Sequence, residues 1–89
     1  MNAIITVVGS DKIGIIAKVS GFLAERNINI IDISQTILSG NFVMMMVVDL
    51  GSSVKTLEEI KKELQDMGES FNVSISMMHE KVFSAMHRI

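Results

Sequence analysis

The chain has 89 residues, a formal net charge of −2 at pH 7 and no cysteine. This length predicts a single domain, and the missing cysteines exclude disulfides, thiolate zinc sites and iron–sulfur clusters. The charge offers no basic surface for nucleic acid, there is no signal-peptide pattern, and no apolar run approaches the ~18 residues of a membrane span. We therefore expect a cytoplasmic protein that contacts neither nucleic acid nor membrane.

The first predicted strand covers residues 3–8 and is apolar on both parities, which is typical of a central strand. Gly9 ends it. The helix that follows is expected to begin at Asp11 as its N-cap and to end near Asn27, which tolerates the left-handed conformation. Its apolar face repeats at helical spacing through Ile15, Val19, Phe22 and Leu23.

A second strand is predicted over 28–38, where β-branched residues are interleaved with polar ones. The alternation shifts after Ile30, so a bulge is expected near Asp32. A short turn over 39–41 leads into a third strand, over 42–50, and the two strands form a hairpin.

The second helix is predicted to begin at an N-cap, Ser53, and to close at Gly68. Its apolar face consists of Leu57, Ile60, Leu64 and Met67. Residues 71–77 alternate between apolar and polar, so they predict a last strand with one wet face. The tail over 79–89 has apolar residues at helical spacing. It is too short to be a stable helix alone, so it is expected to dock on the rest of the chain.

These elements predict an α+β fold in the order βαββαβ, followed by a short C-terminal helix. Right-handed crossovers around the hairpin give a ferredoxin-like sandwich, a four-stranded antiparallel sheet with two helices on one face. The first and third strands should be central and the last an edge. We expect residues 1–89 to form one domain, with the C-terminal helix over 79–89.

The third strand is apolar on both faces, so a row formed by Val43, Met45 and Val47 points away from the two main helices. An uncovered patch of this kind is unusual on a monomer. Either the C-terminal helix covers it, or a second copy does, or both. We therefore predict a homodimer in which the tail or the open sheet face takes part.

The candidate site is the stretch from Gly9 to Ile16, because a helix start offers unpaired N–H groups and a positive dipole end to an anion. Gly14, placed inside the first helical turn, would cost roughly 1 kcal/mol relative to alanine, which points to a close approach at its backbone. Asp11 either caps the helix or also pairs with a ligand ammonium. Asn29 is either a turn residue or a hydrogen-bonding group for a zwitterion between its strand and the loop.

No catalytic set is predicted. The two histidines, His79 and His87, have no acidic cluster beside them, so no metal site is expected. A nucleophile elbow and a phosphate-binding loop are missing. Acylphosphatases share the predicted fold but need an Arg in the first loop, where only Lys12 stands, and RNA recognition on this sheet needs exposed aromatics, where only Phe42 is available. The remaining polar candidates are individually weak: Ser10, Asp32, Ser34 and Gln35.

Two motifs together resemble the ACT domain, the amino-acid-sensing βαββαβ module of metabolic enzymes and regulators. The first is Gly9-x-Asp11-Lys12-x-Gly14-Ile15-Ile16 and the second is Asn29-Ile30-x-Asp32. The resemblance covers 3–89 and is closest to small stand-alone ACT proteins of unknown function and to the two-domain repressors of the glycine cleavage system. Many family members have Pro where Ile13 stands, and no catalytic domain is attached here.

This resemblance implies a non-catalytic regulatory domain without a cofactor, which pairs side by side or face to face and binds a small amino acid at the interface of the pair. The ligand-binding residues expected from it are Gly9, Ser10, Asp11, Lys12, Ile13, Gly14, Ile15, Asn29 and Ile30. Ligand binding would take effect through a regulated protein partner or through a change of oligomeric state. The alternative is a protein-interaction module of the same fold with an empty pocket, and an undetected enzyme is a weaker third.

Overall fold

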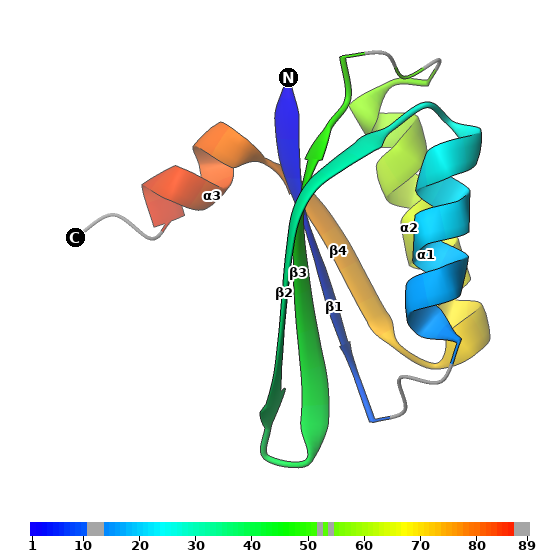
Figure 1. Cartoon of the computed structure of the whole chain (residues 1–89), viewed down its shortest axis with the longest axis vertical. Helices are drawn as coiled ribbons and strands as arrows, with labels where there is room; N and C mark the ends of the chain where they lie inside the picture. The colour runs from blue at the N-terminus through cyan, green and yellow to red at the C-terminus, as the bar shows by residue number, and fades with distance from the viewer. Residues whose placement is uncertain (11–13, 52, 54, 87–89) are drawn as a thin grey trace.

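The computed structural model describes residues 1–10, 14–51, 53 and 55–86. The elements are β1 (Asn2–Gly9), α1 (Ile15–Glu25), β2 (Asn29–Leu38), β3 (Asn41–Asp49), α2 (Leu57–Phe71), β4 (Ser74–His79) and α3 (Glu80–Met86). The strands form one antiparallel sheet in the order β2-β3-β1-β4. Helices α1 and α2 cover one face of it (Figure 1). The predicted ferredoxin-like sandwich is confirmed, with β1 and β3 central and β4 at an edge.

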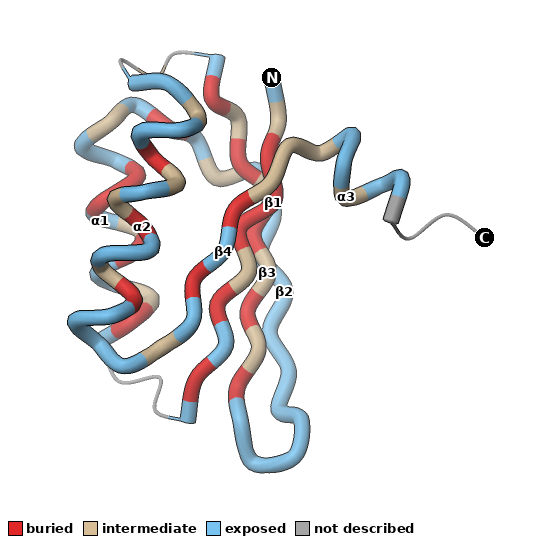
Figure 2. Tube along the Cα trace, turned by 180° about the vertical axis from the view of Figure 1, so that it is seen from behind, coloured by how far each residue is buried: buried red, intermediate tan, exposed pale blue. Residues whose placement is uncertain are grey.

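The core lies between α1, α2 and the face of the sheet that they cover (Figure 2). It is aliphatic and rich in methionine, as the composition requires. Among the described residues no polar or charged side chain is buried, so shape rather than hydrogen bonding specifies the core. The fully buried large side chains are Ile5, Val7, Val19, Leu23, Met44, Met46, Val48, Ile60 and Leu64.

The β2–β3 hairpin turns through two left-handed residues, Ser39 (φ 53°) and Gly40 (φ 82°), as tight antiparallel hairpins require. The register shifts between Ile30 and Asp32, which confirms the predicted bulge. The N–H of Ile33 donates to Asp32 Oδ1 at 2.9 Å and so fixes the bulged segment. Strand β2 pairs only with β3, so its outer edge is free, and nearly all of its residues are exposed.

Helix α1 begins later than predicted. Its N-cap residue is Gly14, in the left-handed conformation with φ 76°, so Asp11 is not the N-cap and Gly14 does not lie inside the first turn. A side chain added at Gly14 would meet nothing within 4 Å, so the backbone conformation explains this glycine rather than a close approach within the chain. The helix ends before Asn27, whose φ of 58° confirms the predicted left-handed residue.

Helix α2 also begins later than predicted, because Thr56 and not Ser53 is its N-cap. The N–H of Glu59 donates to Thr56 Oγ1, and the Glu59 carboxylate accepts from the Thr56 N–H in return. This capping box satisfies two backbone donors at once, which a lone serine cannot do. Ser53 instead forms a local turn with Lys55.

Gly68 does not close α2. The helix runs on to Phe71 and ends at Asn72, which is left-handed with φ 60°. Gly68 is buried where α2 packs on β4, and a Cβ placed there would lie 2.8 Å from the carbonyl oxygen of Val73. Close packing therefore explains this glycine. Since Phe71 belongs to the helix, β4 starts at Ser74, three residues later than predicted.

Helix α3 leaves β4 on the side opposite α1 and α2 and stands away from the sheet (Figure 1). The N–H of Lys81 donates to Nδ1 of His79 at 3.0 Å, and Asn2 Nδ2 donates to Glu80 Oε2 at 3.4 Å. The tail is therefore helical over 80–86 as predicted, and 87–89 lie outside the described residues. Only part of the open face is covered, since Ile4 is 5% exposed but Val8 is 37% exposed.

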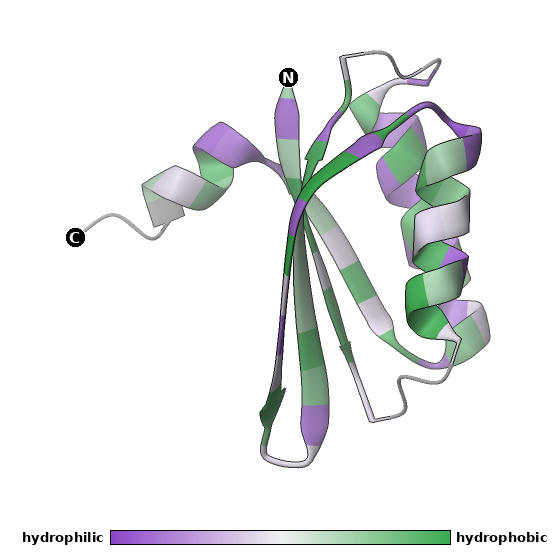
Figure 3. Ribbon diagram, viewed as in Figure 1, coloured by the Kyte–Doolittle hydropathy of each residue, from purple (hydrophilic) through white to green (hydrophobic). Residues whose placement is uncertain are grey.

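Strand β3 is hydrophobic along most of its length (Figure 3). Its inward row is buried in the core, and its outward row of Val43, Met45 and Val47 is half-buried. The predicted apolar row on the open sheet face is therefore present.

Candidate functional site

The start of α1 has the electrostatics of an anion site. Gly14 has no side chain that could cap the helix, and the first turn contains no acidic residue. Among the described residues, therefore, no carboxylate accepts from the first backbone N–H groups, and none offsets the positive end of the helix dipole. Lys18 adds a cation one turn further on, its ammonium 5.9 Å from the centre of the Phe71 ring.

The end of β1, five residues before this helix start, is packed tightly against other elements. Gly9 is buried, and a Cβ there would lie 2.5 Å from Val73 Cγ1 and 3.3 Å from the Phe42 ring. A larger residue would therefore displace the strand end. Ser10 follows it and is exposed.

A hollow of about 210 Å³ lies next to Gly9, lined by Gln35, Thr36, Ile37 and Phe42. The sheet register explains its place, since Gly9 pairs with Phe42 and Phe42 pairs with Ile37. Of these residues only Gln35 was a candidate site residue in the sequence, and a weak one, while Phe42 was considered there as an aromatic for RNA recognition. The hairpin register could have pointed to the others, because it aligns the end of β2 with the end of β1.

The two predicted halves of the site lie at opposite ends of the sheet within one chain. Asn29 pairs with Asp49, which pairs with Asn2 at the start of β1, whereas Gly9 is at its end. The length of β1, about 23 Å at ~3.3 Å per residue, separates the two ends. Asn29 is exposed and its side chain makes no hydrogen bond within the described part of the chain.

The other predicted site residues divide into three kinds. Ile15 is 3% exposed and belongs to the core, so only its backbone faces the loop. Ile30 is half-buried and packs against the core. Asp11, Lys12 and Ile13 lie outside the described residues.

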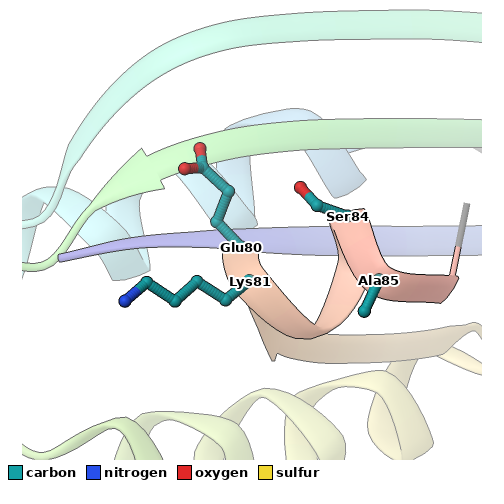
Figure 4. Close-up of a pocket in the computed structure, with 4 residues that line it drawn as sticks. All are labelled: Glu80, Lys81, Ser84 and Ala85. Carbon is teal, nitrogen blue, oxygen red and sulfur yellow. The ribbon is translucent and has the colours of Figure 1, made fainter. Parts of the chain in front are cut away.

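Two further hollows lie on the other side of the molecule. One of about 180 Å³ lies on the open sheet face and is lined by Ile4, Asp32, Ile33, Ser34, Met45, Val47 and Phe83. The larger, about 420 Å³, is lined only by residues of α3: Glu80, Lys81, Ser84 and Ala85 (Figure 4). Because one short helix forms its whole lining, it is an open surface beside α3 rather than an enclosed site.

Among residues 1–10, 14–51, 53 and 55–86, no group of three or more His, Cys, Asp or Glu side chains could hold a metal ion. His79 uses Nδ1 as a hydrogen-bond acceptor at the start of α3. No helix in these ranges is long and apolar enough to cross a membrane.

Known proteins resemble this chain over its whole length. It is 48% identical over 89 residues to the UPF0237 protein of Listeria monocytogenes serotype 4b, covering 100% of both chains. A solved ACT domain protein from Streptococcus pneumoniae is 40% identical, with a TM-score of 0.82, and the match covers 100% of this chain and 97% of that one.

Larger proteins contain the same fold. A formyltetrahydrofolate deformylase from Pseudomonas syringae is 25% identical with a TM-score of 0.77, over 86% of this chain and 26% of that one. A chain assigned as a glycine cleavage system transcriptional repressor has a TM-score of 0.76 at 20% identity, which shows the fold alone; the match covers 86% of this chain and 45% of that one. The sequence model described as the ACT domain matches residues 2–78 and stops before α3. The chain therefore belongs to the ACT domain family.

Proposed function

We propose that this protein is a non-catalytic regulatory domain of the cytoplasm that binds a small amino acid between two copies of the chain. The observation that carries this proposal is the start of α1, which no described side chain caps. The hollow at Gln35 and Phe42 lies at the end of β1 that leads into this helix. ACT domains are typically regulatory and bind amino acids, which favours this ligand class over other small anions.

The ligand's groups match the chemistry of the site. Its carboxylate accepts from the N–H groups at the start of α1, where the dipole favours negative charge. The Asp11 carboxylate takes the ammonium, and the Gln35 amide offers a donor and an acceptor beside it. A volume of about 210 Å³ is below the ~300–1,000 Å³ of sites for drug-sized ligands, so a small side chain against Ile37 and Phe42 is favoured.

A second copy supplies Asn29. The free edge of β2 is available for antiparallel pairing with β2 of another copy, which extends the sheet across a two-fold axis. In such a pair the start of one β2 lies beside the end of the other. The partner subunit's Asn29 then comes to the Ile37 end of the sheet, the end at which Gly9 lies two strands further in, whereas Asn29 of the same chain lies at the opposite end.

A thermal-shift screen of the twenty amino acids tests the ligand class. A ligand at 100 times its Kd should stabilise the protein by about 2.7 kcal/mol. Replacing Asn29 or Asp11 by alanine should reduce the shift, whereas Gln65→Ala, an exposed amide of α2, should leave it unchanged. If no amino acid shifts the melting temperature at millimolar concentration, the proposal fails and the protein-interaction module becomes the better reading.

Mixing two inactive variants tests whether the site is shared. Asp11→Ala and Asn29→Ala each damage one half of every site. A mixed pair contains one intact site if the halves come from different copies, so re-equilibrated mixtures should regain about a quarter of the sites. A site contained in one chain would regain none, because every copy would carry a damaged half.

A further inference from the structure

We propose that the hollow on the open sheet face binds a small aliphatic amine in its protonated form. This hollow of about 180 Å³, the open-face hollow, is lined by residues of β1, β2, β3 and α3. Helix α3 lies on the side of the sheet opposite α1 and α2 (Figure 1). The open-face hollow is therefore separate from the amino-acid site at the start of α1.

The floor of the open-face hollow is apolar, and the sheet register explains its place. Val47 of β3 pairs with Ile4 of β1 on one side and with Asp32 of β2 on the other. Ile4 is only 5% exposed although it lies on the open face, and Phe83 of α3 lines the hollow with it. An alkyl group placed between this floor and Phe83 is removed from water, which favours binding.

The polar side chains of the open-face hollow both come from β2. Beyond the bulge, Asp32 lies opposite Val47 and Ser34 lies opposite Met45. Because residues two apart on a strand share a face, Asp32 and Ser34 lie together at one side of the apolar floor. A ligand on this floor therefore meets polar groups at one end only.

Asp32 gives the open-face hollow a negative charge. It is the one charged residue in the described lining, and it forms no ion pair within the described part of the chain. Its Oδ1 accepts from the N–H of Ile33 at 2.9 Å, which orients the carboxylate. The Ser34 hydroxyl makes no hydrogen bond among the described residues. A carboxylate and a hydroxyl both accept hydrogen bonds, so together they suit an ammonium group.

The charge and the size of the open-face hollow define the class of ligand. An amino acid would bring its own carboxylate close to Asp32, and no cation is present in the described lining to accept it. The volume of about 180 Å³ is below the ~300–1,000 Å³ of sites for drug-sized ligands. Both facts favour a short alkyl chain that carries one ammonium group and no acid.

Methyl NMR of the methionines tests this site, because consecutive side chains of β3 point to opposite faces of the sheet. Met45 lines the open-face hollow, whereas Met44 and Met46 are fully buried in the core. Isopentylamine, which is protonated at pH 7, should shift the Met45 methyl resonance at millimolar concentration and leave the other two in place. Isopentanol has the same chain without the charge and should bind about fivefold more weakly. An unmoved Met45 resonance, or equal affinities for the amine and the alcohol, would overturn the proposal.

Asp32→Asn tests the ion pair, because it removes the charge while the amide oxygen can still accept from the N–H of Ile33. It should weaken binding of isopentylamine by about fivefold, the upper end for an ion pair open to solvent. Asp66→Asn is the same change at an exposed position of α2 and should bind the amine as the wild type does. Unchanged binding by Asp32→Asn, or an equal loss in both variants, would refute recognition by Asp32. Since the amine titration does not involve the start of α1, its outcome is independent of the amino-acid screen.

Discussion

Arg26 Nη2 lies 2.7 Å from Glu63 Oε2, and this ion pair joins the end of α1 to the middle of α2. The Arg26 guanidinium also lies 3.6 Å from the centre of the Phe22 ring, and Lys55 Nζ lies 2.9 Å from Glu63 Oε1. One carboxylate therefore receives two cations at the outer surface of the helix layer. This network sets the relative position of α1 and α2 where the apolar core ends.

Glu63 should make folding sensitive to acid. Hydrogen bonds from Arg26 and then from Lys55 lower the pKa of Glu63 from 4.5 to about 2. Because the folded pKa is the lower one, this contribution to stability is present above about pH 4.5 and is lost as the pH falls toward 2. Urea unfolding should be measured at a series of pH values between 2 and 7. The free energy of unfolding should fall less steeply on acidification for Glu63→Gln than for the wild type.

Glu58→Gln is the matched control for that series. Glu58 lies on the same helix, is exposed, and forms no ion pair within the described residues. The free energy of unfolding of Glu58→Gln should therefore fall with acidification as steeply as that of the wild type. Equal slopes for the wild type and Glu63→Gln would contradict the assignment.

The glycines of the two helices should respond to alanine in opposite directions. Gly68→Ala puts a Cβ 2.8 Å from the Val73 carbonyl oxygen, so it should destabilise the protein by about 1–3 kcal/mol. Gly21→Ala meets nothing within 4 Å on an exposed position of α1, so it should stabilise by about 0.4–1 kcal/mol. Chemical denaturation measures both. A neutral Gly68→Ala would mean that α2 can move away from β4.

The N-cap of α2 can be located by a pair of alanine variants. Thr56→Ala removes the capping box and should cost about 1 kcal/mol. Ser53→Ala removes only a local turn and should change the free energy of unfolding by less than about 0.5 kcal/mol. A larger loss of stability for Ser53→Ala than for Thr56→Ala would show instead that Ser53 is the N-cap of the helix.

His79→Ala should loosen α3 without unfolding the core. The imidazole Nδ1 accepts from the N–H of Lys81, so alanine leaves a donor of the first turn without its side-chain partner. Amide hydrogen exchange should become faster in α3 and stay unchanged in β1 and β3. Asn in place of His79 can accept the same hydrogen bond and should restore protection. Faster exchange throughout the sheet would show instead that His79 supports the core.

The strand order, the hairpin and the bulge near Asp32 could be predicted because each follows from a local pattern, namely two-residue periodicity, a turn signal or a shift of parity. The helix starts could not. Ser53 and Thr56 are both good N-caps, and only the reciprocal bond with Glu59 decides between them. Glycine is typical of helix ends, so the sequence around Gly68 predicts one. Gly68 instead lets α2 pack closely on β4, a tertiary contact that no local pattern encodes.

Whether the candidate residues form a binding site stays a prediction, but the places of two of them in the fold follow from local patterns. Gly9 lies at the end of β1 and Asn29 at the start of β2, as the sequence predicts. Their separation along the sheet depends on register, so the sequence left open whether Asn29 acts within its own chain. The hollow at Ile37 and Phe42 also arises from register alone.

The two edges of the sheet differ in length, since β2 has ten residues and β4 has six. A head-to-tail filament joining β2 of one copy to β4 of the next would leave four residues of every β2 without partners. In the proposed pair, two β2 strands of equal length run antiparallel, so a two-fold axis closes this contact at two copies. The longer edge therefore favours a finite pair over open-ended growth, and in the proposed pair this exposed strand would no longer be a template for aggregation.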